Sequence, residues 1–226
     1  MRFDEWEPFY IEILEDFGFT RTRDEEAAEL LSELLSGHVG LGVGSGKEPL
    51  ERLTGLINGR TVVVCGNAPS LSSDLSRLGE EKESCFIAAD GASAILLKKA
   101  KVPDVVVTDL DGDPSALLEA SRQGSAMVVH AHGDNLDALR TYVPFFREPL
   151  GTTQSRPLRN VHNFGGFTDG DRCVFLARSL GASRVKLIGF DFYDPRVTPR
   201  KAKKLLWAKR LIDLALAEGL SLEIEG

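Results

Sequence analysis

Apolar and polar residues alternate in blocks along most of this chain. Short apolar runs of four or five residues, rich in valine, isoleucine and alanine, are separated by stretches with helical spacing. Such runs predict buried strands, and strands that alternate with helices predict a mostly parallel, doubly wound α/β sheet. The expected strands are Thr61–Cys65, Cys85–Ala89, Val105–Thr108, Ala126–His130, Val185–Gly189 and a final edge strand, Ser221–Glu225.

The start of the chain follows a purely helical pattern. Aromatic and aliphatic residues recur at helical spacing over Phe3–Phe17, and Gly18 is expected to end that helix. Thr22 and Glu25 have the spacing of a capping box in front of a second apolar face. Segment 37–46 carries a glycine at alternate positions and predicts a linker. The sequence therefore predicts a small N-terminal helical appendage.

Composition sets the class of protein. A chain of 226 residues with 42% hydrophobic residues can form one sizeable α/β domain, expected over residues 48–226, with residues 1–47 as the appendage and linker. A net charge of −7 argues against a nucleic-acid partner. No apolar run approaches the ~20 residues of a membrane span, and three cysteines without a C-x-x-C pair suit a reducing compartment. We therefore expect a cytoplasmic protein.

Carboxylates follow three of the predicted strands. Asp90 follows the second strand, Asp109 and Asp111 the third, and Asp134 the fourth. The carboxyl ends of parallel strands open onto the ligand crevice, where clustered carboxylates repel one another unless a cation lies among them. Alternate residues leaving a strand point the same way, so Asp109 and Asp111 can face one ion. The four residues predict Mg²⁺ that holds a nucleoside triphosphate.

Two glycine turns are candidates for contacting phosphate. The first strand ends in a turn that opens a helix and is expected to present free backbone N–H groups. A second glycine pair precedes another helix and allows close approach of a ligand. Tight turns with a helix cap are the structural alternative at both places. The candidate nucleotide contacts are Gly66, Asn67, Pro69, Ser70, Gly165, Gly166 and Thr168.

Histidines and aromatic residues add two further candidates. His130 and His132 form a His-x-His pair, but no third His or Cys lies at useful spacing, which makes zinc the weaker interpretation. His132 is better placed for phosphate or substrate, and His130 for the strand core. Asp191 lies between Phe190 and Phe192, an arrangement that suits a flat heterocycle, although a loop brace would explain it as well.

Taken together, four segments resemble the archaeal 6-hydroxymethyl-7,8-dihydropterin pyrophosphokinases: Gly66–Leu71, Ala89–Ala92, Thr108–Gly112 and His130–Asn135. The resemblance runs from about Thr61 to Asp191, and the helical N-terminus is similar too.

The resemblance implies transfer of a diphosphate from ATP to the pterin hydroxymethyl group, with release of AMP. Asp109 and Asp111 would hold Mg²⁺, joined by Asp134 and Asp90. His132 and Asp134 are candidates for taking the alcohol proton, and Asp191 for binding the pterin edge. A role in tetrahydromethanopterin or folate-type cofactor synthesis follows from the resemblance alone.

Three alternatives stay open. Thiamine pyrophosphokinase is similar in its Asp-Gly-Ala and Asp-Leu-Asp elements, but its C-terminal β-rich domain is not evident here. Motility-accessory glycosyltransferases share a similar central domain, yet this chain has little beyond that core for a sugar acceptor. A non-catalytic nucleotide-binding module would leave the clustered carboxylates unexplained. Association into a homo-oligomer is also open.

Overall fold

The computed structural model describes residues 1–38, 48–79, 81, 83–217 and 221–224. Their strands form one eight-stranded sheet in the order β6-β5-β4-β3-β2-β1-β7-β8, and every neighbouring pair is parallel. The strands are β1 (Thr61–Cys65), β2 (Cys85–Ala89), β3 (Val105–Thr108), β4 (Ala126–Ala131), β5 (Leu150–Thr153), β6 (Val161–His162), β7 (Arg184–Ile188) and β8 (Ser221–Ile224). The predicted α/β class is confirmed.

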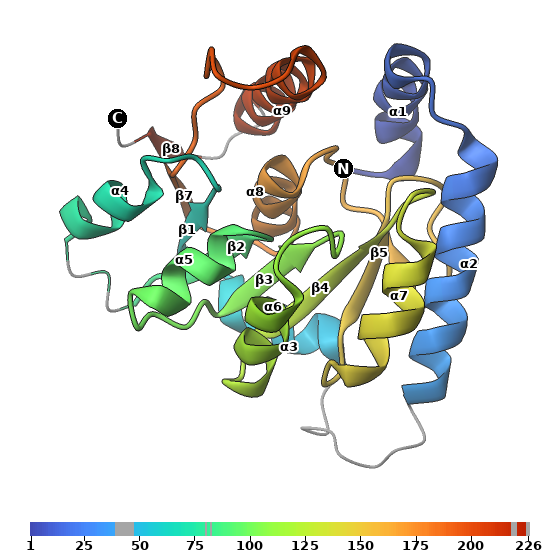
Figure 1. Ribbon diagram of the computed structural model, residues 1–226, viewed down its shortest axis with the longest axis horizontal. Coiled ribbons are helices and arrows are strands. Elements are labelled where there is room, and N and C mark those ends of the chain that lie inside the picture. The colour runs from blue at the N-terminus through green and yellow to red at the C-terminus, as the bar shows by residue number, and fades with distance from the viewer. Residues whose placement is uncertain (39–47, 80, 82, 218–220, 225–226) are drawn as a thin grey trace.

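Helices cover both faces of the sheet (Figure 1). Alternate strand residues feed two separate cores: Val62 and Val64 face one, whereas Val63 and Cys65 face the other. The Val62 face packs against α1 (Phe3–Phe17), α3 (Pro49–Ile57), α8 (Asp169–Ser179) and α9 (Pro199–Ala217). The Val63 face packs against α2 (Arg21–His38), α4 (Leu71–Arg77), α5 (Ala92–Lys98), α6 (Pro114–Arg122), α7 (Leu136–Tyr142) and the 3₁₀ helix η1 (Val143–Phe145).

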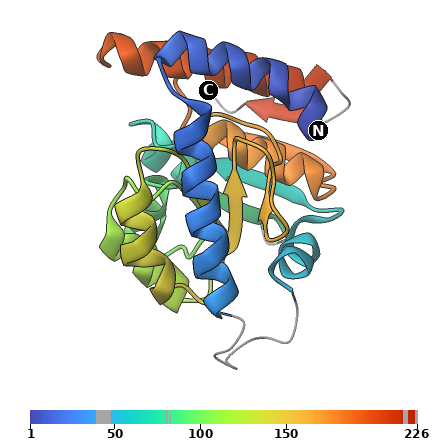
Figure 2. The ribbon, with the colours of Figure 1, turned by 90° about the vertical axis from the view of Figure 1, so that its right-hand side faces the viewer.

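The two N-terminal helices lie on opposite faces of the sheet. Helix α1 buries Trp6 and Tyr10 and lies beside α9, above α8 (Figures 1 and 2). Helix α2 runs along β5 and α7 and buries Ala27 and Leu31 in the other core. Because both helices supply core residues, their connection is held near the carboxyl ends of β4 and β5.

Several boundaries differ from the sequence prediction. Helix α2 begins at Arg21, so Thr22 lies inside it rather than capping it. The same helix continues to His38, and residues 39–46 of the expected linker lie outside the described residues. Strands β5 and β6 were not predicted, because β5 has the sequence Leu-Gly-Thr-Thr and β6 has only two residues. None of the helices in the described ranges combines the length and hydropathy that a membrane span requires.

The strand order fixes where ligands can enter. The chain moves from β1 through β2 to β6 on one side, then returns to place β7 and β8 on the other side of β1. The connection that leaves the carboxyl end of β1 therefore runs toward β2, whereas the one that leaves β7 runs in the opposite direction, toward β8. Such a switch point is the usual ligand crevice of an open α/β sheet.

Candidate active site

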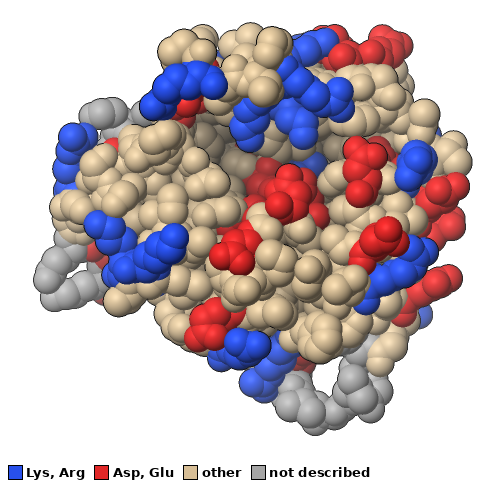
Figure 3. All heavy atoms as spheres, in the orientation of Figure 1, with Lys and Arg blue, Asp and Glu red and all other residues tan. Residues whose placement is uncertain are grey.

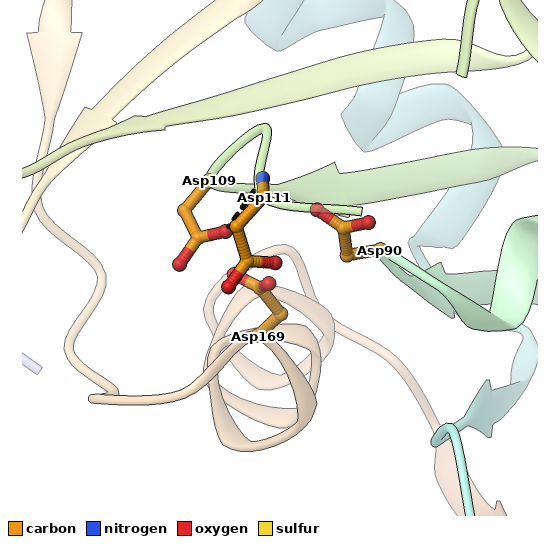
Figure 4. Close-up of side chains that lie close together, drawn as sticks. All are labelled: Asp90, Asp109, Asp111 and Asp169. Atoms are coloured by element: carbon orange, nitrogen blue, oxygen red, sulfur yellow. Dashed lines mark hydrogen bonds between the residues drawn. The ribbon is translucent and has the colours of Figure 1, made fainter. Parts of the chain in front are cut away.

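Four carboxylates meet above the middle of the sheet (Figure 4). Asp90 follows β2, Asp109 and Asp111 follow β3, and Asp169 is the first residue of α8. One carboxylate oxygen from each lies within 4.8 Å of the others. Three of them were predicted at strand ends. Asp169 was missed because an acidic residue at a helix start is usually a cap, and only the tertiary fold brings α8 over β3.

A turn after β3 brings Asp109 and Asp111 together. Leu110 between them has a φ of 69°, in the left-handed region that a non-glycine residue seldom adopts. The turn is held by two hydrogen bonds: the Leu110 N–H donates to Thr108 Oγ1 at 2.8 Å, and the Asp111 N–H donates to Asp109 Oδ1 at 3.3 Å. The expected proximity is present, but its cause is this Asx-type turn rather than strand alternation.

Asp90 lies behind this turn and is buried. Its Oδ2 accepts a hydrogen bond from Thr108 Oγ1 at 2.5 Å, whereas its Oδ1 is buried with no partner among the described residues. A Cβ at Gly112 would lie 1.7 Å from that Oδ1, so only glycine leaves room for the carboxylate. An unpaired buried carboxylate oxygen is costly unless a cation or donor completes it.

His132 and Asn135 fix Asp109 from the β4 side. His132 Nε2 lies 3.4 Å from Asp109 Oδ2, and His132 Nδ1 accepts the Asp134 N–H at 3.3 Å. This arrangement requires the tautomer with its proton on Nε2. Asn135 Nδ2 donates to the Asp109 and His130 carbonyl oxygens, both at 2.7 Å, and so links the ends of β3 and β4. Both ring nitrogens of His132 therefore have a polar neighbour, and its expected part in taking the alcohol proton stays a prediction.

The start of α8 presents Asp169 to the cluster. Thr168 is the N-cap, and Asp171 accepts the Thr168 N–H at 2.8 Å and the Phe167 N–H at 2.5 Å. Asp169 itself pairs with buried Arg172, with Nη1 to Oδ1 at 2.9 Å. The cap residues therefore hold the helix start, and Arg172 neutralises only part of the acidic charge.

The glycine pair before α8 shapes the backbone. Gly165 and Gly166 have φ of 91° and 95°, and a Cβ at Gly166 would lie 2.8 Å from Arg172 Cα. This close approach gives Gly166 a structural role beside Arg172, and Thr168 has one as the N-cap of α8. Contact of Gly165, Gly166 and Thr168 with a nucleotide stays a prediction.

The carboxylates have unequal proton affinities. Burial raises the pKa of Asp90 to about 6, with further increases from Asp109 and Asp111. Partial desolvation beside the other carboxylates and the Asp109 charge raise the pKa of Asp111, and burial lifts the pKa of Asp169 well above its usual range. Burial would also raise the pKa of Asp109, but the His132 hydrogen bond and the Arg172 charge bring it below its ordinary value. The four carboxylates together carry more negative charge than Arg172 and His132 beside them can balance.

This donor set fits a hard divalent cation. Carboxylate oxygens are the ligands that Mg²⁺ prefers, and a buried Asp90 oxygen without a hydrogen-bond partner among the described residues leaves negative charge for a cation to balance. Figure 3 shows acidic side chains near the middle of this face and basic side chains over α9 above them. The positive charges of Lys201 and Lys204 on α9 partly offset the increase in the pKa of Asp111.

Asp134 and His130 lie outside this group. The Asp134 carboxylate is exposed and does not belong to the four-carboxylate cluster, so the structure does not bring it together with the three other expected metal ligands. His130 is 2% exposed, its Nδ1 lies 3.1 Å from Thr152 Oγ1, and burial lowers its pKa. That placement matches the expected core histidine. In the described part of the chain, the His-x-His pair gains no further zinc ligand.

The turn after β1 has fewer open donors than expected. The Gly66 and Ala68 N–H groups donate to the Ile188 and Gly189 carbonyl oxygens, both at 2.9 Å, because pairing between β1 and β7 continues past the strands. Ser70 is the N-cap of α4 but its side chain makes no cap hydrogen bond. Asn67 and Pro69 are exposed at the rim. A phosphate could not use the Gly66 amide without breaking this pairing.

The aromatic pair after β7 lies next to that turn. Phe190 and Phe192 have ring centroids 5.6 Å apart, and a Cβ at Gly66 would lie 3.0 Å from the Phe190 ring. Asp191 is exposed, and its Oδ1 accepts the Tyr193 N–H at 3.1 Å. The three residues thus occupy the β1/β7 side of the acidic cluster, and their contact with a pterin stays a prediction.

Comparison with known proteins gives the family. The family model described as 6-hydroxymethylpterin diphosphokinase MptE-like matches residues 44–196. Three similar archaeal proteins are each named 6-hydroxymethyl-7,8-dihydropterin pyrophosphokinase. The protein of Methanothermobacter thermautotrophicus is 44% identical over 223 residues, covering 92% of each chain. That of Methanocaldococcus jannaschii is 42% identical over 236 residues, covering 94% of this chain and 95% of its own. That of Pyrococcus furiosus is 47% identical over 192 residues, covering 85% and 79%. The chain therefore belongs to the MptE-like 6-hydroxymethylpterin diphosphokinase family.

Proposed function

We propose that this protein transfers the diphosphate of ATP to the hydroxymethyl group of 6-hydroxymethyl-7,8-dihydropterin and releases AMP. The observation that carries the proposal is the group of four carboxylates above β3, in a chain whose relatives bear the name of this pyrophosphokinase. A place in tetrahydromethanopterin or folate-type cofactor synthesis is part of the same proposal.

In this proposal Asp109, Asp111 and Asp169 hold Mg²⁺, with Asp90 behind them. Bound Mg²⁺ would neutralise charge on the non-bridging phosphate oxygens. His132 keeps Asp109 in its ligating orientation, since its Nε2 lies against Oδ2. Asp134, in the loop after β4, has its carboxylate outside the cluster and would contact substrate rather than metal.

The reaction moves one phosphorus centre from one oxygen to another. The pterin hydroxyl oxygen forms a bond to the β-phosphorus, and the bond from that phosphorus to the oxygen shared with the α-phosphate breaks. AMP leaves with that oxygen, and the hydroxyl proton is lost to solvent. Because such transition states are loose, positioning and charge neutralisation matter more than a strong base. This suits a site in which His132 has no free ring nitrogen.

An acceptor panel tests the proposal. Purified protein with ATP and Mg²⁺ would be offered the dihydropterin, thiamine or a sugar acceptor, and the products identified by mass spectrometry. We expect a pterin that gains two phosphates, with little product from the others. Comparable turnover of thiamine, or no reaction with the pterin, would overturn the assignment.

A further inference from the structure

A pocket of about 250 Å³ opens on the β4/β5 side of the acidic cluster. Its walls are residues 18–20 between α1 and α2, the first turn of α2, the loop 132–134 after β4, and Gln154 after β5. Pockets for drug-sized ligands usually measure about 300–1,000 Å³. The size therefore suits a small bicyclic ring better than a whole nucleotide.

The pocket adjoins the cluster through one residue. His132 lines it, and the Nε2 of the same ring lies 3.4 Å from Asp109 Oδ2. In the pterin substrate a single carbon separates the reacting hydroxyl oxygen from the ring. In ATP the ribose and the α-phosphate separate adenine from the β-phosphorus. A ring pocket one side chain away from the metal ligands therefore fits the acceptor.

The strand order leaves room for the two substrates on opposite sides of the acidic cluster. Attacking and leaving oxygens lie roughly in line across the phosphorus, so acceptor and AMP must approach from opposite directions. β4 and β5 lie on one side of β3, whereas β1 and β7 lie on the other. At ~4.8 Å per strand, the turn at Gly66 is about 10 Å from the end of β3, which leaves room for the α-phosphate and ribose.

The pocket wall has the chemistry of a site for a flat, hydrogen-bonding ring. Phe19 is partly exposed there and is supported by Phe17, with ring centroids 5.7 Å apart. Gln154 is 4% exposed, and its Oε1 has no hydrogen-bond partner within the described ranges. Its Nε2 donates to Asp24 Oδ2 at 2.8 Å, and Asp24 Oδ1 accepts the Gly133 N–H at 2.8 Å. A buried acceptor without a donor is stabilised by a ligand that brings N–H groups.

We infer that this pocket binds the pterin ring, an inference that rests on the proposed function. Phe19 stacks on the ring, the Gln154 amide binds its N–H edge, and the hydroxymethyl group points past His132 to the cluster. The connection between α1 and α2 is thereby part of the substrate site. Phe190, Asp191 and Phe192 then belong to the nucleotide side rather than to the pterin side.

Separate titrations of the two ligands test this assignment. The full-length protein would be titrated with 6-hydroxymethylpterin by fluorescence, and with α,β-methylene-ATP and Mg²⁺ by calorimetry. Phe19→Ala removes the stacking ring, and Thr20→Trp fills the pocket from an exposed position outside the core. Phe192→Ala is the matched control across the cluster. We expect the two pocket variants to raise the Kd for the pterin about tenfold, and the control to leave it unchanged.

The outcomes separate the two proposals. If the wild type forms AMP and pterin diphosphate while folded Phe19→Ala and Thr20→Trp bind the pterin normally, this inference is wrong and the proposed function stands. If both variants weaken only the ATP analogue, the pocket holds adenine and the inference is again wrong. If the wild type neither binds nor converts the pterin, the proposed function fails, and the inference fails with it.

Discussion

His132 Nε2 lies 3.4 Å from Asp109 Oδ2 and joins the loop after β4 to the loop after β3. The same ring separates the acidic cluster from the pocket beside β5. One histidine thus belongs to both parts of the site: it contacts Asp109, a proposed metal ligand, and it lines the pocket proposed for the acceptor.

Replacing His132 should weaken metal binding more than it weakens folding. Loss of a group that orients a metal ligand typically costs about 10–100-fold in metal affinity or activity. We therefore expect His132→Ala to raise the Mg²⁺ concentration for half-maximal turnover by that order. His132→Gln keeps a side-chain N–H donor and should recover part of the loss. An unchanged Mg²⁺ dependence in folded His132→Ala would show that the ring does not orient Asp109.

Three of the four cluster carboxylates should matter far more for kcat than Asp134 does. Asp109→Asn, Asp111→Asn and Asp169→Asn each remove charge from the cluster and should lower kcat by ~10²–10³-fold or more, the order seen for other preorganised charges. Asp134 lies outside the cluster and lines the neighbouring pocket, so Asp134→Asn should change the KM for the pterin more than kcat. Steady-state turnover at ordinary Mg²⁺ checks this. A larger loss in Asp134→Asn than in Asp169→Asn would exchange their assigned roles.

Asp90 makes the metal-free protein sensitive to pH. Its pKa in the folded protein is about 6, above the value of ~3.9 in an unfolded chain. The folded state therefore binds this proton more tightly, and the stability that it contributes is present below pH ~4 and is lost as the pH rises through about 6. Cation binding requires the ionised carboxylate. Mg²⁺ should thus raise the Tm more at pH 8 than at pH 5.

Asp90→Asn is the control for this titration. The variant has no proton to lose, so the extra dependence of its metal-free Tm on pH between 4 and 7 should shrink, as thermal melts would show. Equal stabilisation of the wild type by Mg²⁺ at pH 5 and pH 8 would contradict the placement of Asp90 at the metal.

Sequence reasoning located the strand ends but not everything that converges on them. Asp90, Asp109 and Asp111 were predictable because parallel strands end at a common edge. Asp169 could be recognised only as a helix-start residue, since its approach to β3 depends on how α8 packs. The local sequence signal for Asp169 was that two acidic residues, Asp169 and Asp171, follow the glycine pair Gly165-Gly166. Asp134 follows its strand as the others do, yet its carboxylate is exposed and lies outside the cluster.

The N-terminal helices show the same limit. Their spacing predicted two amphipathic helices, and both are present. The spacing did not reveal that they lie on opposite faces of the sheet or that residues 18–20 line a pocket. Those contacts join residues more than 100 positions apart, as when Trp6 Nε1 donates to the Gln154 carbonyl oxygen at 2.8 Å. The spacing of apolar residues within one helix does not show which other elements that helix packs against.

Trp6→Ala should destabilise the whole protein. The side chain is fully buried, its ring centroid lies 6.4 Å from that of Phe175 on α8, and it supports Gln154 at the pocket. Removing a buried tryptophan typically costs about 3–5 kcal/mol. Denaturant unfolding would measure the loss, and Ile11→Ala, at an exposed position of the same helix, is the matched control. Equal stability of the two variants would show that α1 is not part of the core.

Product analysis tests the central claim most directly. The protein would be incubated with ATP, Mg²⁺ and 6-hydroxymethyl-7,8-dihydropterin, and AMP, ADP and the pterin products separated by chromatography. Attack at the β-phosphorus predicts AMP and pterin diphosphate in equal amounts at every time point, without ADP. Formation of ADP with a pterin monophosphate would mean attack at the γ-phosphorus and would contradict the account.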